Sequence, residues 1–148
     1  MATPQYWLIK SEPSVYAYAQ LEREGRTEWS GVRNFEARNN LRAMKPGDLC
    51  LYYHSNEDKA VVGVARVLSA ATEDPTAPGE DWASVNMGPV VAFQKPVELT
   101  TVKATAALQT FPLITRSRLS VAPVTPEHFQ HVLSLGGTKL PAKPPRAR

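Results

Sequence analysis

Several features that mark well-known classes of protein are missing from the sequence. Its single cysteine, Cys50, excludes an intramolecular disulfide and a zinc site built from several cysteines. No apolar run approaches the roughly 20 residues of a membrane-spanning helix, and the N-terminus lacks the basic and apolar blocks of a secretory signal. We therefore expect a soluble protein of the cell interior, cytoplasmic, associated with the nucleoid in a bacterium or nuclear in a eukaryote, with no membrane partner.

Signatures of enzymes and cofactor sites are scarce too. No glycine-rich phosphate loop follows the first predicted strand, and no Gly-x-Ser-x-Gly elbow is present. His128 and His131 lie three residues apart in a predicted helix, but their surroundings do not complete a metal-binding set. The sequence therefore predicts a protein without cofactor or metal.

Length and charge indicate one folded domain followed by a basic segment. The 148 residues are 43% hydrophobic and 21% charged, close to the average of globular domains. The net charge of +3 arises in the last ten residues, which hold four basic side chains and no acid, whereas residues 1–138 hold 13 basic and 14 acidic ones. We expect residues 1–136 to fold and the proline-rich basic tail, residues 137–148, to be disordered.

Short strands dominate the middle of the chain, with helices inserted between them. Hydrophobic periodicity and turn residues predict strands at 5–9, 49–54, 60–68, 85–93 and 119–124, and helices at 15–24, 35–44, 102–110 and 126–135. The Gly88–Pro89 pair predicts an edge or a bulge within its strand, and the polar residues 72–81 predict a surface loop. This order favours a mixed α+β domain with a curled sheet over a doubly wound parallel sheet.

The predicted helix that begins after Asn34 has two faces of different chemistry. At helical spacing, one face is apolar and its neighbour carries three cations: Ala37, Leu41 and Met44 on the first, and Arg38, Arg42 and Lys45 on the second. Such an array suits phosphate binding, because Arg and Lys donate to phosphate oxygens without reading sequence. The alternative is a solvated face on which arginine stems cover apolar surface.

Aromatic side chains lie near polar turns, where they suit a planar ligand as well as a core. Trp7 lies among apolar neighbours in a strand, and we expect it in the core. Trp29 lies in a polar stretch predicted as a loop, where an indole needs either a packing partner or a ligand. Alternation along the strand at 49–54 predicts that one of Tyr52 and Tyr53 faces inward and the other elsewhere. Stacking on an extruded base contributes about 1–3 kcal/mol, so one or two such walls decide binding.

Four ordered segments give the sequence a resemblance to the EVE domain family, and the resemblance covers residues 6–133. They are Tyr6–Pro13, Trp29–Asn39, Gly47–Asp48 with Leu51–Ser55, and Arg118–Thr125. The resemblance implies a PUA-like fold, a curled, barrel-like mixed β-sheet with surrounding helices, related to YTH and ASCH domains. Two residues depart from the family pattern: Phe35 stands where Tyr is usual and Glu36 where Gln is usual.

The resemblance also implies a function, a non-catalytic nucleic-acid-binding domain that seats a modified base in a pocket. Modified cytosine in DNA is the implied ligand class, and RNA is a second one through the relation to YTH domains. The residues of the base pocket would come from four segments: Lys10, Ser11, Glu12 and Pro13; Trp29, Ser30, Val32 and Asn34; Tyr52, Tyr53, His54 and Ser55; and Leu119 and Ser120. Flanking phosphates would bind a set of arginines: Arg33, Arg38, Arg42 and Arg118.

Two other functions fit parts of the sequence. Some ASCH-type relatives are amidohydrolases of acylated cytidine, and Lys10, Ser11 and Glu12 supply the lysine, hydroxyl and carboxylate that such chemistry uses. Adjacent strand residues point to opposite faces, which argues against their convergence. In a third interpretation, the arginine face binds an acidic protein. The hypothesis of a monomeric base reader requires a cavity beside Trp29 and fails if the indole is sealed in the core.

Overall fold

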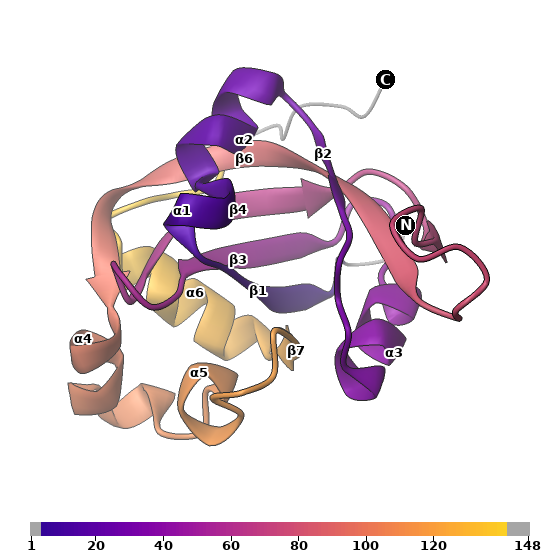
Figure 1. The fold of residues 1–148 in the computed structure, drawn as a ribbon. Helices are drawn as coiled ribbons and strands as arrows, with labels where there is room; N and C mark the ends of the chain where they lie inside the picture. Colours follow the sequence, from indigo (N-terminus) through magenta and orange to yellow (C-terminus); the bar gives the residue numbers. More distant parts are fainter. Residues whose placement is uncertain (1–3, 142–148) are drawn as a thin grey trace.

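The computed structural model of the protein describes residues 4–141, which form a curled mixed sheet with helices on both faces (Figure 1). The strands are β1 (Tyr6–Ser11), β2 (Thr27–Trp29), β3 (Leu49–His54), β4 (Ala60–Val67), β5 (Thr72–Glu73), β6 (Ala83–Glu98) and β7 (Val121–Val124). Along the sheet their order is β2-β6-β4-β3-β1-β7, and the short β5 pairs with β6. Strands β1 and β3 run parallel, and the other neighbouring pairs are antiparallel.

Helices come in two groups, one for each face of the sheet. They are α1 (Pro13–Tyr16), α2 (Tyr18–Glu24), α3 (Phe35–Ala43), α4 (Leu99–Ala104), the 3-10 turn η1 (Ala106–Leu108), α5 (Pro112–Thr115) and α6 (Pro126–Leu135). Buried side chains of α2 and α3 join one hydrophobic cluster, and those of α4, η1, α5 and α6 join a second. No helix in the described part of the chain is long and apolar enough to cross a membrane.

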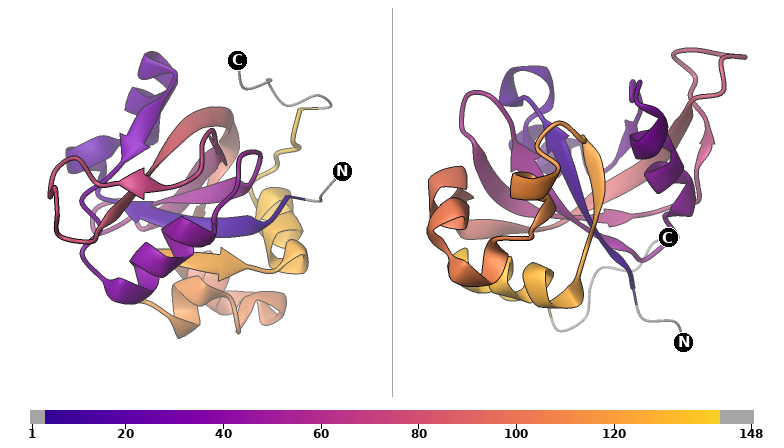
Figure 2. Two further views of the ribbon diagram at one scale, coloured as in Figure 1. Left: turned by 90° about the vertical axis from the view of Figure 1, so that its right-hand side faces the viewer. Right: turned by 90° about the horizontal axis from the view of Figure 1, so that it is seen from below.

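Strand β6 gives the sheet its curl. It is 16 residues long: its first part pairs with β2, and the strand then arches across the sheet, as Figures 1 and 2 show. Its register with β4 shifts twice, once near Pro89, so the predicted bulge is confirmed. The strand is longer than predicted, and it is not an edge strand because it pairs with β2 and β4.

Both faces of the sheet are buried, which corrects the prediction for the two adjacent tyrosines. Tyr52 packs in the first cluster with Trp7, and Tyr53 packs in the second cluster with Leu8. Neither tyrosine ring is exposed, because helices cover the face toward which each one points. The alternation of side chains along the strand was predicted correctly. The prediction did not include helices on the second face of the sheet. The prediction that Trp7 lies in the core is confirmed.

Helix ends follow the capping residues where the sequence supplies them. The side chain of Asn34 accepts a hydrogen bond from the backbone N–H of Ala37 (2.9 Å), and that of Thr125 accepts one from His128 (3.1 Å), so α3 and α6 begin as predicted. The helix predicted at 15–24 is instead divided at Ala17, whose backbone is extended.

Three other local predictions needed correction. The single helix predicted at 102–110 is wrong, because helix α4 ends at Ala104, Thr105 is extended and the 3-10 turn η1 follows. Trp29 ends a strand instead of lying in a loop, because it pairs with Val85 of β6. Of the tail predicted to be disordered, residues 142–148 lie outside the described residues, while Thr138 is buried and accepts a hydrogen bond from the backbone N–H of Gln94 (2.9 Å).

One glycine makes the packing of α2 on the sheet possible. A Cβ atom at Gly63 in β4 would lie 2.7 Å from the ring of Tyr18, which is closer than carbon atoms approach. The Tyr18 hydroxyl donates to the carbonyl of Val64 (2.7 Å), and burial raises the pKa of Tyr18 to about 12. The ring therefore lies flat against the strand and fixes α1 and α2 next to the end of β1.

Candidate nucleic-acid interface

Trp29 borders a pocket of about 240 Å³ where β1, α1 and β2 meet. We call it the Trp29 pocket, and its lining residues are Ser11, Val15, Tyr16, Thr27, Glu28, Trp29 and Ser30. The indole is half-buried, so it is not sealed inside the core. The volume lies below the roughly 300–1,000 Å³ of pockets for drug-sized ligands, and it suits a single planar group.

Tyr52 supports the Trp29 pocket from behind. Its ring meets the indole of Trp29 edge to face, with centroids 5.4 Å apart and planes at 84°. Its hydroxyl donates to the backbone carbonyl of Tyr16 (2.6 Å), so it fixes two walls of the pocket at once. Burial raises the pKa of Tyr52, which keeps the hydroxyl protonated as a donor. The ring itself is fully buried, and the predicted stacking of a base on Tyr52 does not fit this arrangement.

The lining of the Trp29 pocket combines hydrogen-bonding groups with one exposed apolar side chain. Ser11, Thr27 and Ser30 carry hydroxyls, which can donate or accept, and Tyr16 and Trp29 add aromatic surface to the lining. The carboxylate of Glu28 accepts a hydrogen bond from Ser84 (2.7 Å). Val15 is 71% exposed at the rim, an unusual position for a large apolar residue. Recognition of an extruded base needs this mixture of stacking surface and polar groups.

A buried aspartate in the 72–82 segment holds the chain that follows Trp29. One carboxylate oxygen of Asp74 accepts from the backbone N–H of Gly31 (2.8 Å) and from the guanidinium of Arg33 (3.0 Å). The other accepts from the backbone N–H (2.7 Å) and the hydroxyl (2.6 Å) of Thr76. Burial alone would raise the pKa of Asp74, but these hydrogen bonds outweigh it and hold the pKa well below its usual range.

The role of Asp74 was missed by the sequence interpretation, which placed this segment on the surface. The available signal was local. Aspartate side chains commonly accept a hydrogen bond from the backbone N–H two residues further on, as Asp74 does from Thr76. Arg33, predicted to bind phosphate, instead has its guanidinium on Asp74 and on the hydroxyl of Thr76 (2.9 Å). It therefore positions the wall of the Trp29 pocket.

Two of the predicted phosphate-binding arginines, Arg38 and Arg42, lie together on α3. Asp81 joins them: Arg38 contacts one of its carboxylate oxygens at 3.1 Å and Arg42 the other at 2.6 Å. We call these two side chains the arginine pair. The Asp81 side chain is 73% exposed, so this ion pair is in contact with solvent. A separate hollow of about 500 Å³ borders Arg42, Asp81 and Trp82.

Lys10 belongs to the other face of the sheet. Its ammonium group donates to the backbone carbonyls of Arg116 (3.3 Å) and Ser117 (3.0 Å), and burial lowers its pKa to about 8. A hollow of about 280 Å³ lies in this region, lined by Asn34, Glu36, Thr115, Arg116, Ser117, Arg118 and Leu119. Glu36, which stands where the family pattern has Gln, forms an ion pair with Arg116 (2.8 Å), so its negative charge is compensated.

The side chains of Lys10, Ser11 and Glu12 do not converge. Lys10 reaches the backbone near residue 116, Ser11 lines the Trp29 pocket, and the carboxylate of Glu12 accepts from Asn56. The expected alternation along β1 is therefore present. The structure does not assemble the three groups that amide hydrolysis would use.

Other predicted pocket residues take part in the frame around the site. His54 accepts from the backbone N–H of Tyr18 (3.0 Å) through Nε2, and its Nδ1 lies 2.7 Å from the carboxylate of Asp58. The Ser55 N–H donates to the carbonyl of Ser11 (3.0 Å). Three more are structural neighbours that do not line the Trp29 pocket: Pro13 begins α1, Val32 is buried, and the carbonyl of Ser120 accepts from the N–H of Lys10.

The residues predicted for the base pocket are thus divided between separate places. Ser11, Trp29 and Ser30 line the Trp29 pocket, whereas Asn34 and Leu119 line the hollow near Arg118. Tyr53 faces the second hydrophobic cluster, away from Trp29. The sequence interpretation missed four lining residues: Val15, Tyr16, Thr27 and Glu28. Thr27 and Glu28 line the pocket because β2 pairs with β6. This pairing joins segments that are far apart in the sequence, so local sequence patterns did not predict it.

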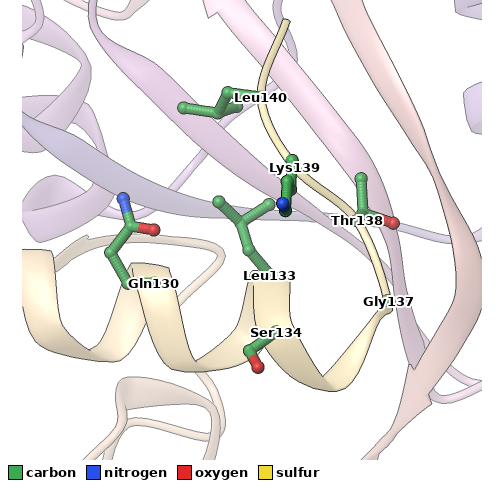
Figure 3. A pocket seen from close by; sticks show the side chains of 7 residues that line it. All are labelled: Gln130, Leu133, Ser134, Gly137, Thr138, Lys139 and Leu140. Carbon is green, nitrogen blue, oxygen red and sulfur yellow. The ribbon is translucent and has the colours of Figure 1, made fainter.

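A larger hollow of about 540 Å³ lies between α6 and residues 137–140 (Figure 3). Leu133 of α6 faces Lys139 and Leu140 across it, and Gln130 borders it. None of the residues predicted to bind a base lies here. The hollow adjoins the end of the described residues at position 141, and we base no site on it.

Comparison with known proteins gives a consistent match over nearly the whole described chain. The model of the EVE domain matches residues 5–135. Thymocyte nuclear protein 1 of Mus musculus is 33% identical over 168 residues, which cover 90% of this chain and 74% of that protein.

Solved structures agree with the sequence match. A crystal structure of an Agrobacterium tumefaciens protein is 43% identical, with a TM-score of 0.90 and coverage of 96% of this chain and 99% of that one. A crystal structure of the human THYN1 protein in complex with 5-methylcytosine-containing DNA is 31% identical, with a TM-score of 0.81 and coverage of 91% and 99%. These backbones confirm the expected PUA-like fold with its curled mixed sheet.

Proposed function

The chain belongs to the EVE domain family, and from this premise we propose that it binds DNA and reads a modified cytosine in the Trp29 pocket. The observation that carries the proposal is the pocket itself: a half-buried indole borders a space of about 240 Å³ that is open to solvent and lined by hydroxyls. The human THYN1 protein, a structural neighbour, was solved with DNA that contains 5-methylcytosine, which supports the ligand class.

In the proposed mechanism, one base leaves the DNA stack and enters the pocket with its face against Trp29. Hydroxyls of Ser11 and Ser30 hydrogen-bond the polar edge of the base, since each can donate or accept. The 5-methyl group meets the apolar surface of Val15 at the rim. Burial of one methyl group contributes about 0.8 kcal/mol, or roughly a fourfold preference.

Phosphates next to the extruded base bind the arginine pair and Arg118. Arg38 and Arg42 lie one helical turn apart, so both guanidiniums project from the same side of α3. Arg118 and Asn34 line the same hollow next to the start of α3. Because such contacts release counterions from the nucleic acid, affinity falls as salt concentration rises, for all sequences alike.

We propose binding without catalysis. The separation of Lys10, Ser11 and Glu12 supports this, because an amide hydrolase would need its nucleophile and base within hydrogen-bonding distance. We further propose that residues 1–136 contain the whole site, that the chain acts as a monomer, and that DNA is preferred to RNA. Light scattering of the complex and competition by an RNA oligomer of the same sequence test the last two points.

Calorimetric titration with matched oligonucleotides tests the proposal. The wild-type protein is expected to bind an oligonucleotide with one 5-methylcytosine several-fold more tightly than its unmodified twin. Trp29→Ala removes the stacking wall, and we expect affinity to fall by about fivefold to 150-fold. Trp29→Phe is the matched control, because it keeps a planar ring and is expected to retain most of the affinity. Equal affinity of the wild-type protein for the two oligonucleotides would overturn the reading function.

A further inference from the structure

An exposed pair of stacked aromatic rings lies beside the arginine pair. Phe35 is 67% exposed at the first position of α3, and its ring stacks on Trp82 with centroids 5.3 Å apart and planes at 13°. The Arg38 guanidinium carbon lies 5.0 Å from the centroid of Phe35 and 5.9 Å from that of Trp82. In the described part of the chain, Phe35 and Val15 are the large hydrophobic residues with exposed side chains.

Packing of the domain does not explain why Phe35 is apolar. Helix α3 is anchored through Ala37 and Leu41, which are buried in the first hydrophobic cluster. Phe35 belongs to neither buried cluster and presents most of its ring to solvent. The ring of Phe35 is held by Trp82 on one side and by Arg38. It offers a surface on which a base can stack, because a base can add to an existing aromatic stack.

The arginine pair already holds an oxyanion. The carboxylate of Asp81 lies between Arg38 and Arg42, one oxygen on each guanidinium, and the Asp81 backbone carbonyl accepts from both arginines at 3.3 Å. Two guanidiniums that share one carboxylate have the geometry that also suits the oxygens of a phosphate. The Asp81 side chain is on the surface and that of Arg42 is 41% exposed, so another anion can approach this pair from solvent, although Arg38 is only 15% exposed.

We propose that Phe35, Trp82, Arg38 and Arg42 form a second nucleotide site that takes a neighbour of the extruded base on the same DNA strand. The neighbouring base stacks on Phe35, and its phosphate replaces the carboxylate of Asp81 between the two guanidiniums. This site shares no lining residue with the Trp29 pocket. Its assignment to DNA rests on the proposed function, but its own contacts are with features that every nucleotide has.

Other charges near the site have partners within the described residues. The guanidinium carbon of Arg33 lies 5.5 Å from the ring centroid of Trp82, and this side chain donates to Asp74. Glu36 follows Phe35 in α3 and pairs with Arg116. Glu73 lines the hollow next to Trp82, and its carboxylate accepts from the backbone N–H of Gly79 (2.6 Å). Asp81 is therefore the acid that competes directly with a phosphate for the arginine pair. The hydrogen bond from Arg42 and the nearby positive charges lower the pKa of Asp81, so it competes as a charged group at neutral pH.

Two substitutions at Phe35 test the stacking surface. Phe35→Leu keeps an apolar side chain without a planar ring, and Phe35→Tyr keeps the ring and serves as the matched control. We expect Phe35→Leu to weaken binding of a DNA oligonucleotide about fivefold or more, equally for modified and unmodified DNA. The free nucleoside 5-methyldeoxycytidine has no phosphate for the arginine pair, so we expect it to bind in the Trp29 pocket with an affinity that Phe35→Leu leaves unchanged. Phe35→Tyr should match the wild-type protein in both titrations.

A second pair of variants tests the phosphate position. Asp81→Asn removes the competing charge with almost no change in shape, and we expect about fivefold tighter binding of the same oligonucleotide. Glu80→Gln removes an equal charge from the preceding residue, which forms no ion pair with Arg38 or Arg42 in the described part of the chain. We expect it to have a smaller effect on affinity. Thermal melting of each variant verifies that the fold is retained.

The outcomes separate this inference from the proposed function. Unchanged oligonucleotide affinity in Phe35→Leu would overturn the second site, and so would equal effects of Asp81→Asn and Glu80→Gln. Either result leaves the preference for 5-methylcytosine intact. Loss of that preference in the wild-type protein, with the Phe35→Leu effect still present on both oligonucleotides, would overturn the reading function and support the second site.

Discussion

Two aspartates in the same surface segment bind arginines in opposite ways. Asp74 is fully buried and accepts four hydrogen bonds, which connect it to the backbone after Trp29, to Arg33 and to Thr76. Asp81 has a side chain that is 73% exposed and contacts the arginine pair on α3. The two carboxylates lie seven positions apart in the sequence, yet one is inside the fold and the other on its surface.

The difference shows how one segment both builds a rigid wall and leaves a ligand site accessible. A buried carboxylate cannot exchange its hydrogen-bond partners for water. Removal of the carboxylate or of its donors therefore leaves an unsatisfied buried group, at a cost of several kcal/mol. An exposed ion pair contributes about 0–1 kcal/mol, because water and salt compete with it. We therefore infer that Asp74 fixes the shape of the Trp29 pocket. The carboxylate of Asp81, in contrast, can be displaced from the arginine pair by an anion that binds more strongly.

The largest effect is expected at Asp74. Asp74→Ala leaves the N–H of Gly31 and the guanidinium of Arg33 without their acceptor, and we expect the free energy of unfolding to fall by about 3 kcal/mol. This is the lower end of the range for broken buried pairs, since the Arg33 side chain is 40% exposed. Urea unfolding measures the change, and Asp81→Ala is the matched control. A loss under about 1 kcal/mol would mean that Asp74 does not hold the pocket wall.

Acid provides a second way to release the same contact. The pKa of Asp74 is held below its value in the unfolded chain, so its stabilising effect is complete above about pH 3.9. It is then lost progressively as the pH falls toward the pKa of the folded state, because the unfolded chain binds the proton first. We expect the free energy of unfolding of the wild-type protein to decline over this acid range. In Asp74→Asn the decline should be shallower, and equal slopes in urea titrations at several pH values would contradict this.

Much of the fold could be predicted because its determinants are local. Asn34 and Thr125 marked the starts of α3 and α6, and the apolar run at 49–54 marked β3. Predictions failed where tertiary contacts override local preference. Ala17 has high helix propensity but divides α1 from α2, and Tyr53 is buried by helices that come later in the chain.

The candidate site was only partly predictable for the same reason. Trp29 and Ser11 were recognised from their motifs, and the structure brings them together as lining residues of one pocket. The contact between Gly31 and Asp74 spans 43 residues, and the acidic, proline-containing segment around Asp74 resembles a solvated loop. The sequence also could not show that Asp81 would lie between Arg38 and Arg42, since charge counting treats each arginine as free.

The smallest effect is expected at Asp81, and it completes the contrast with Asp74. Asp81→Asn removes the charge of a carboxylate that is 73% exposed, so we expect the free energy of unfolding to change by no more than about 0.5 kcal/mol. The same substitution at the buried position, Asp74→Asn, should be clearly more destabilising because its acceptors serve four hydrogen bonds. Urea unfolding of both variants in one buffer makes the comparison direct. If the two variants lost equal stability, Asp81 would be a structural residue like Asp74, and a phosphate could not replace its carboxylate without loosening the fold.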